Sequence, residues 1–134
     1  MTVIVCVDER LGRTFLGKRQ SRDALLCEDV LSLVGSSRLF LSPYSAPLFE
    51  GAAVSISENY LAEATRGDFC FCEREALSPY LGKISRLVLY RWNRLYPSDT
   101  VLDVLPEACG MTRVSSHEFV GKSHETITRE VFET

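Results

Sequence analysis

Arginine and aromatic side chains gather directly after an apolar run that ends at Tyr90. They include Arg91, Trp92 and Arg94. The apolar run is typical of a buried strand, and side chains alternate along a strand. We therefore predict that Val88, Tyr90, Trp92 and Arg94 share one face. That face is either the wall of a ligand site or a surface that a helix covers.

A carboxylate near the start of a predicted helix is the candidate catalytic group. The helix spans Ser21–Val34, with Ser21 as its predicted N-cap and Asp23 on the same stripe as the buried Leu26 and Cys27. A desolvated carboxylate in a cleft often serves function. The alternative is that Asp23 lies in the first turn because the helix dipole favours negative charge there.

Glycines after the first predicted strand mark a second candidate region. Asp8, Gly12 and Gly17 follow the apolar segment Thr2–Val7. Two glycines five residues apart indicate a mobile loop at the carboxyl end of the strand, where α/β folds bind ligands. The alternative is a plain connection between a strand and a helix.

The elements that must position these residues form an α/β fold. Continuous apolar segments without polar alternation predict interior strands. The interior strands are predicted at Thr2–Val7, Asp68–Glu73 and Arg86–Tyr90, with a shorter strand at Arg38–Leu41. Met111–Phe119 and Thr126–Phe132 flank a turn and predict an antiparallel hairpin. We expect one domain over residues 1–134, with a mixed, mostly parallel central sheet that ends in this hairpin.

Composition excludes several classes of function. The 134 residues carry a net charge of −3, which disfavours nucleic-acid binding through a basic face. Stacking of a single nucleic-acid strand on the arginine and aromatic residues is disfavoured for the same reason. No apolar run approaches the ~20 residues that cross a membrane. Five cysteines without disulfide spacing suit a reducing compartment. We expect a cytoplasmic protein.

Two further groupings of reactive residues are weaker. Cys70, Cys72, His117 and His124 contain the ligand types of a zinc site, but their spacing matches no known zinc pattern. Neighbouring cysteines on one face of a strand are usually small buried residues. Serines close to the histidines suggest a hydrolase, but no G-x-S-x-G motif is present. We predict no metal site.

A resemblance to a known family links several of these residues. Val7-Asp8-Glu9-x-x-Gly12-x-x-x-x-Gly17-Lys18 is similar to the first strand and active-site loop of bacterial dihydrofolate reductases. The resemblance implies that Asp23 holds the position of the family's helix carboxylate, where it would fix or protonate a ring nitrogen through a raised pKa. It also implies that Tyr44 and Ser45 lie where the family binds the cofactor phosphates.

The sequence departs from the family at its nucleotide-binding positions. Pro43 and Tyr44 replace basic residues, and no Lys or Arg occurs between Leu39 and Thr65. No Gly-Gly pair is present for close approach to a cofactor. Phosphate recognition needs free backbone N–H groups and usually a cation. We therefore expect no dihydrofolate reductase activity, no tight binding of a nicotinamide dinucleotide and no resident cofactor.

Two functions of different class remain open. The first is a domain that binds a small heterocyclic or nucleotide ligand in a cleft beside Asp23. The ligand-binding residues predicted for it are Asp8, Gly12, Gly17, Tyr44, Ser45, Arg91, Trp92 and Arg94. The second is a non-catalytic module that forms a homo-oligomer or binds a partner protein through its aromatic and arginine residues. For that stretch we predict at least one pair between an arginine and a carboxylate, with Asp99 or Asp103 as the partner.

Overall fold

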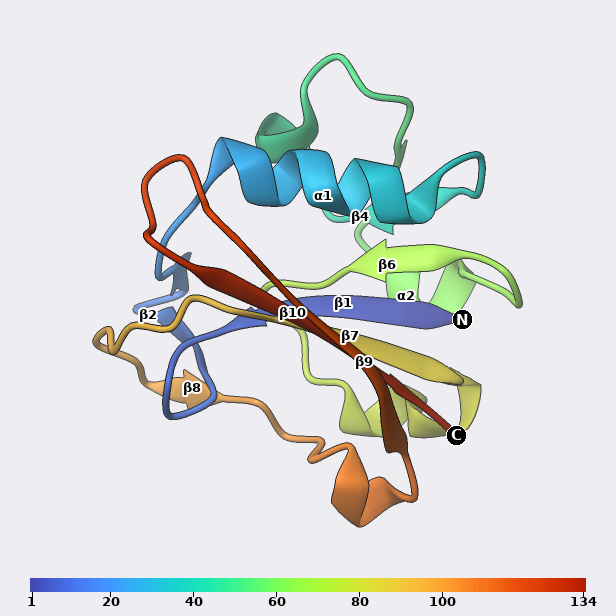
Figure 1. Cartoon of the computed structure of the whole chain (residues 1–134). Helices are drawn as coiled ribbons and strands as arrows, with labels where there is room; N and C mark the ends of the chain where they lie inside the picture. The colour runs from blue at the N-terminus through green and yellow to red at the C-terminus, as the bar shows by residue number, and fades with distance from the viewer.

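A mixed sheet of seven strands forms the centre of the molecule in the computed structural model, which describes residues 1–134 (Figure 1). Its strands are β1 (Thr2–Val7), β4 (Leu39–Leu41), β5 (Ser55–Ile56), β6 (Phe69–Phe71), β7 (Arg86–Arg91), β9 (Thr112–Phe119) and β10 (Ile127–Glu133). The strand order is β5-β4-β6-β1-β7-β10-β9. The pairings among the first five are parallel, and β10 runs antiparallel to both of its neighbours.

Short elements surround this sheet. A small second sheet has the order β3-β2-β8. Its strands are β2 (Gly12–Phe15), β3 (Lys18–Arg19) and β8 (Thr100–Val101). The helical elements are α1 (Ala24–Val34), α2 (Tyr60–Glu63) and the 3-10 turns η1 (Ala46–Phe49), η2 (Ser78–Lys83) and η3 (Glu107–Cys109).

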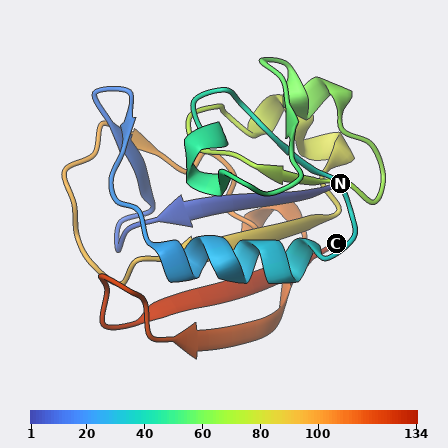
Figure 2. The same ribbon diagram turned by 90° about the horizontal axis from the view of Figure 1, so that it is seen from above.

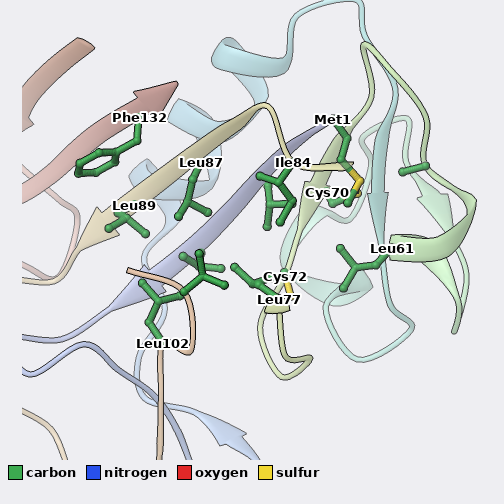
Figure 3. Close-up of a cluster of buried hydrophobic side chains, with 14 of the residues drawn as sticks. Met1, Leu61, Cys70, Cys72, Leu77, Ile84, Leu87, Leu89, Leu102 and Phe132 are labelled. Carbon is green, nitrogen blue, oxygen red and sulfur yellow. The ribbon is translucent and has the colours of Figure 1, made fainter. Parts of the chain in front are cut away.

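Each face of the main sheet has its own hydrophobic core. Helix α1 lies over the central strands in Figure 2 and buries Leu26, Val30 and Val34 against one face. The opposite core contains Cys70 and Cys72 of the β6 region and is drawn in Figure 3. Both faces are covered because parallel strands are joined by crossover connections that pass over the sheet. The continuous apolar pattern of the interior strands follows from this double burial.

The predicted architecture is confirmed. The three predicted interior strands correspond to β1, β6 and β7, and each has a neighbour on both sides. Both phenylalanines of β6, Phe69 and Phe71, are buried. The C-terminal hairpin is β9 and β10. The predicted start of the helix was wrong, because α1 begins at Ala24 and its N-cap is Asp23 rather than Ser21, and β6 is shorter than the predicted Asp68–Glu73.

The glycine-containing loop after β1 is a β-hairpin rather than an irregular segment. Strands β2 and β3 are joined by Leu16 and Gly17, which have φ values of 53° and 75°. Positive φ at both turn residues matches the twist of the two strands, and glycine tolerates it best. Gly12 approaches its neighbours closely, since a Cβ there would lie 2.7 Å from the Cβ of Ser98. The two glycines therefore shape a folded connection.

We expect the core on the α1 face to be sensitive to the loss of one ring. Phe71 is 2% exposed and packs edge-on against Phe49, with ring centroids 5.0 Å apart. Phe71→Ala should lower the free energy of unfolding by about 3–5 kcal/mol, because it leaves a cavity. Phe15→Ala, at a ring that is 42% exposed, should change it by no more than about 0.5 kcal/mol. Urea denaturation measures both values, and equal losses would contradict this packing.

Candidate functional site

The carboxylate of Asp23 is the most highly connected polar group near the carboxyl ends of the sheet strands. Its Oδ1 accepts hydrogen bonds from the backbone N–H groups of Leu25 at 2.9 Å and Leu26 at 3.3 Å, which caps helix α1. The same oxygen accepts from Lys122 N at 3.0 Å, and Oδ2 accepts from Ser123 N at 2.9 Å. Asp23 thus joins the start of α1 to the turn between β9 and β10.

His124 extends this network to two hydroxyl groups. Its Nδ1 lies 2.8 Å from Asp23 Oδ2, while its Nε2 lies 2.9 Å from Ser21 Oγ and 3.1 Å from the Tyr96 hydroxyl. The imidazole also stacks on Trp92, with ring centroids 4.6 Å apart. An ionised carboxylate only accepts hydrogen bonds, so Nδ1 carries a proton. In the neutral ring, Nε2 is then the acceptor that faces both hydroxyls.

The pKa of Asp23 is lowered, so the prediction of a raised pKa is wrong. Burial alone would raise the pKa of this carboxyl group. Hydrogen bonds from His124 and from the N–H groups of Lys122, Ser123 and Leu25 outweigh burial and hold the pKa well below its usual range. Asp23 is therefore ionised near neutral pH and has no proton to give to a ring nitrogen.

A glycine makes room for this carboxylate at the hairpin turn. A Cβ on Gly121 would lie 2.7 Å from Asp23 Oδ2 and 3.0 Å from the carbonyl oxygen of His124. The backbone N–H of Gly121 donates to that same carbonyl at 3.0 Å. The turn can approach Asp23 this closely because the side chain is absent.

The cleft predicted between β1, Asp23 and the Tyr44–Ser45 turn is filled by an ion pair. Arg19 of β3 binds Glu73 through two hydrogen bonds, of 2.8 Å and 2.9 Å. Ser45 Oγ donates to Glu73 Oε1 at 2.7 Å, and the backbone N–H of Arg19 donates to the Tyr44 hydroxyl at 2.8 Å. The guanidinium also lies 4.3 Å from the centre of the Tyr44 ring. The β2–β3 hairpin is thereby fixed over the ends of β4 and β6.

Only a small polar cavity of about 10 Å³ remains at this position. That volume holds roughly one water molecule. Its lining residues are Cys6, Arg13, Arg19, Gln20, Ser21, Glu73 and Trp92. Two buried lining atoms, Arg13 Nε and Gln20 Oε1, have no hydrogen-bond partner in the protein. Burial raises the pKa of the Cys6 thiol well above its usual value, which keeps that thiol protonated.

The arginine and aromatic residues after Tyr90 do not form one site. Trp92 is buried on the α1 face against His124, in the core that also contains Tyr90. Arg91 ends β7 and forms an ion pair with Glu130 of β10, while Arg94 is exposed and has no ion-pair partner. The predicted shared face therefore holds for Tyr90 and Trp92 and is lost at Arg94. Asn93 explains this loss, since its φ of 58° ends the extended strand.

The predicted arginine–carboxylate pair is confirmed, but both proposed partners were wrong. Asp99 accepts from the backbone N–H of Leu16 at 3.0 Å. Asp103 accepts from the N–H groups of Leu77 and Ser78 at the start of η2. Both carboxylates bind backbone donors in loops, and the partner of the strand arginine comes from the antiparallel neighbour, 39 residues further along the chain.

Asp8 has a structural position at the end of β1. Its Oδ1 accepts from Arg10 N and Gly12 N, both at 2.8 Å, and its Oδ2 accepts from Gln20 Nε2 and Tyr96 N. Burial would raise the pKa of Asp8, but these hydrogen bonds lower it. The predicted ligand residue Gly17 is exposed at the hairpin turn, away from this network.

A surface groove lies between α1 and η1, and apart from Asp23 its residues were not predicted as site residues. Its volume is about 470 Å³. Its lining residues are Arg22, Asp23, Ala24, Cys27, Glu28, Leu31, Leu48, Phe49, Glu50, Lys122 and Ser123. Asp23 is the one predicted site residue among them. The groove depends on three segments that are distant in the sequence, so no local pattern marks it.

The cysteines and histidines considered as zinc ligands lie apart. Cys70 and Cys72 are buried in the core on one face of the sheet, whereas His124 stacks on Trp92 on the other. His117 lies on the exposed strand β9. No group of three or more His, Cys, Asp or Glu side chains has the geometry to hold a metal ion. None of the helices combines the length and the hydrophobicity needed to cross a membrane.

No family model and no curated protein sequence matches this chain. Its structure is nevertheless similar to that of the dihydrofolate reductase from Enterococcus faecalis, solved in complex with NADP(H) and RAB-propyl. The TM-score is 0.69, the sequence identity is 12%, and the likeness covers 98% of this chain and 94% of that chain. The chain therefore has a dihydrofolate reductase-like fold, as the resemblance predicted. At this identity the similarity establishes the fold and leaves the reaction open.

The lowered pKa of Asp23 predicts a pH-dependent contribution to stability. A lowered native pKa stabilises the fold above the ordinary carboxyl pKa of about 3.9, and this contribution is lost as the pH falls below that value. Asp23→Asn should therefore lower the free energy of unfolding near neutral pH by about 1.5–3 kcal/mol, the range for hydrogen bonds to a charged group. The deficit should shrink below about pH 4. Urea denaturation at the two pH values measures it.

Glu118→Gln is the matched control, because Glu118 is exposed and forms no ion pair. Its free energy of unfolding should stay within about 0.5 kcal/mol of the unmodified protein at both pH values. A deficit for Asp23→Asn that is the same at both pH values would show that the charge of Asp23 contributes nothing.

Proposed function

We propose that this chain is a small-molecule-binding domain that does not reduce dihydrofolate. Its ligand is a small planar heterocycle that carries a carboxylate, and the binding site is the groove between α1 and η1. The groove carries the proposal because it combines a volume of about 470 Å³, within the roughly 300–1,000 Å³ typical of ligand pockets, with apolar side chains and two cations that have no ion-pair partner. All five cysteines are free thiols, and we place the protein in the reducing cytoplasm.

The chemistry of the groove supports this class of ligand. Leu31, Leu48 and Phe49 provide apolar surface against which a flat ring can pack. Arg22 and Lys122 are exposed at the same groove and form no ion pair within the chain, and Glu28 and Glu50 also line it. A ligand carboxylate can pair with the two cations and ring N–H groups can donate to the glutamates, while burial of the ring provides affinity.

Three features argue against reductase chemistry with a nicotinamide dinucleotide. Asp23 is held ionised by its hydrogen bonds and is not a proton donor near neutral pH. Ser45 provides the hydroxyl at the position where the family binds the cofactor phosphates. Here that hydroxyl donates a hydrogen bond to Glu73, whose carboxylate repels a phosphate. Pro47 lies in the first turn of η1, where it removes a backbone N–H donor.

A thermal-shift titration with two compounds tests the proposal. Folic acid combines a planar heterocycle with carboxylates and should raise the melting temperature saturably, because a ligand at 100 times its Kd stabilises a protein by about 2.7 kcal/mol. NADPH should produce no saturable rise over the same range. The protein should also show no NADPH-dependent reduction of dihydrofolate.

Two matched variants each introduce one glutamate, and each places it in a different apolar hollow. Leu48→Glu alters the α1–η1 groove, whereas Leu105→Glu alters a separate hollow on the opposite face of the sheet, at a residue 51% exposed. Leu48→Glu should abolish the shift with folic acid and Leu105→Glu should keep it. A saturable shift with NADPH, or a folic acid shift that survives Leu48→Glu, would refute the proposed site.

Strand β9 favours a second function, self-association. It forms the edge of the sheet and pairs with β10 alone, so one side of its backbone is unpaired. The strand is eight residues long and exposed along nearly its whole length, including Val114 at 54%. A long exposed edge can pair with a second copy of the same strand and continue the sheet. We propose a homodimer through β9 as the alternative role of the domain.

A single charge at this edge tests self-association. In a symmetric β9–β9 pair, Val114→Lys places two like charges at the interface, which opposes pairing. Light scattering across a concentration series should show a dimer for the unmodified protein and a monomer for Val114→Lys. The control is Val101→Lys, a change on exposed strand β8 at a residue 58% exposed, which should leave the dimer intact. A monomer for the unmodified protein at all concentrations would exclude this role.

A further inference from the structure

Ser21, His124 and Asp23 form a continuous hydrogen-bonded chain with the order hydroxyl, imidazole, carboxylate. Ser21 Oγ lies 2.9 Å from His124 Nε2, and His124 Nδ1 lies 2.8 Å from Asp23 Oδ2. These are the roles and distances of a nucleophile, a general base and the group that orients the base. The side chains of the histidine and the aspartate are 2% and 0% exposed, so the imidazole is fixed in this orientation.

We propose that Ser21 is a nucleophile, that His124 activates it, and that the site accepts acyl groups from small carboxylic esters. Asp23 is a positioning residue in this arrangement. The inference does not depend on heterocycle binding, because it concerns the hydroxyl of Ser21 and its base rather than the affinity of the groove.

The tautomer of His124 makes Ser21, rather than the nearby Ser123, the candidate nucleophile. Ser123 Oγ lies 3.3 Å from His124 Nδ1. That nitrogen carries the proton given to Asp23, so it cannot act as a base toward Ser123. Nε2 carries the free lone pair in the neutral ring, and Ser21 is on that side. Of the two serines, only Ser21 is therefore placed for deprotonation by His124.

The acyl transfer is balanced within these groups and water. Ser21 Oγ attacks the ester carbonyl while its proton moves to His124 Nε2, and the carbon–oxygen bond to the leaving alcohol then breaks as the alcohol takes that proton. Water attacks the acyl-serine with His124 again as the base, which releases the carboxylic acid and restores the hydroxyl. The net reaction converts an ester and water to an acid and an alcohol.

Ser21 can be reached by a small ester, because it is partly exposed, unlike its two partners. The residues that follow it, Arg22 and Asp23, line the 470 Å³ groove, as does Lys122, which comes from the turn that carries His124. Charges of both signs line this groove, since Glu28 and Glu50 accompany Asp23 against the two cations. The lining therefore does not select a negatively charged ester over a neutral one.

The hydroxyl of Tyr96 competes with that of Ser21 for the basic nitrogen of His124, and this competition can be measured. The Tyr96 hydroxyl lies 3.1 Å from the same His124 Nε2 that faces Ser21. A single lone pair serves both hydroxyls, so Tyr96 holds the base away from Ser21 for part of the time. Removing the hydroxyl of Tyr96 should therefore accelerate acylation of Ser21. Loss of a merely structural hydrogen bond would not produce that acceleration.

The test uses 4-nitrophenyl acetate with the full chain, and follows release of 4-nitrophenolate together with peptide mass spectrometry of the acylated protein. We expect an acetyl group on Ser21. Ser21→Ala should abolish both the adduct and the protein-dependent release. His124→Gln should slow acylation by at least about a hundredfold, the lower range for general-base catalysis. Tyr96→Phe should accelerate it.

Ser36→Ala is the control, at an exposed serine in the turn after α1, and it should acylate at the unmodified rate. Thermal melting of every variant separates loss of reactivity from loss of fold. If His124→Gln does not fold, Ser21→Ala provides the decisive comparison, because Ser21 is partly exposed and lies outside α1. The proposal is overturned if no acetyl adduct forms, if the adduct lies on another residue, or if Ser21→Ala keeps the unmodified rate.

Discussion

The hydrogen-bonded carboxylate of Asp23 is the constraint on which this end of the molecule depends. It caps α1, binds two backbone N–H groups of the β9–β10 turn and orients His124. A buried charge is tolerated only when its hydrogen-bonding capacity is satisfied, and each of these donors comes from a segment that must therefore be in place. Gly121 is required for the same reason, because a side chain there would occupy the space of the carboxylate oxygen.

The dihydrofolate reductase-like fold of this chain carries its own arrangement of polar groups. The Arg19–Glu73 pair fills the space beside β1, β4 and β6, and it is hydrogen-bonded to the hydroxyl of Ser45 as well. An open groove lies along α1 and η1. The main sheet and its two cores do not depend on which of these spaces is filled, since the strands are stabilised by apolar contacts on both faces. This independence allows one fold to present different sites.

The sequence predicted the sheet well because the residue pattern that marks each strand is local in the sequence. Buried strands such as Thr2–Val7 and Arg86–Arg91 contain continuous apolar runs, and the terminal hairpin follows from two strand-like segments around a turn. It also singled out Asp23, which in the structure is the N-cap of α1. The direction of its pKa was wrong because the donors Lys122, Ser123 and His124 lie about 100 residues away, and no local pattern reveals such partners. The pairing of Arg91 with Glu130 was missed for the same reason.

Stability and reactivity have a common cause at the start of α1. Because Asp23 is ionised, His124 keeps its proton on Nδ1 and turns Nε2 toward Ser21 and Tyr96. Trp92 fixes the plane of the imidazole by stacking on it, so the ring cannot rotate to exchange its two nitrogens. The interactions that hold the hairpin turn against the helix therefore also fix which nitrogen is basic. A serine placed beside that nitrogen faces a base that the fold has already oriented.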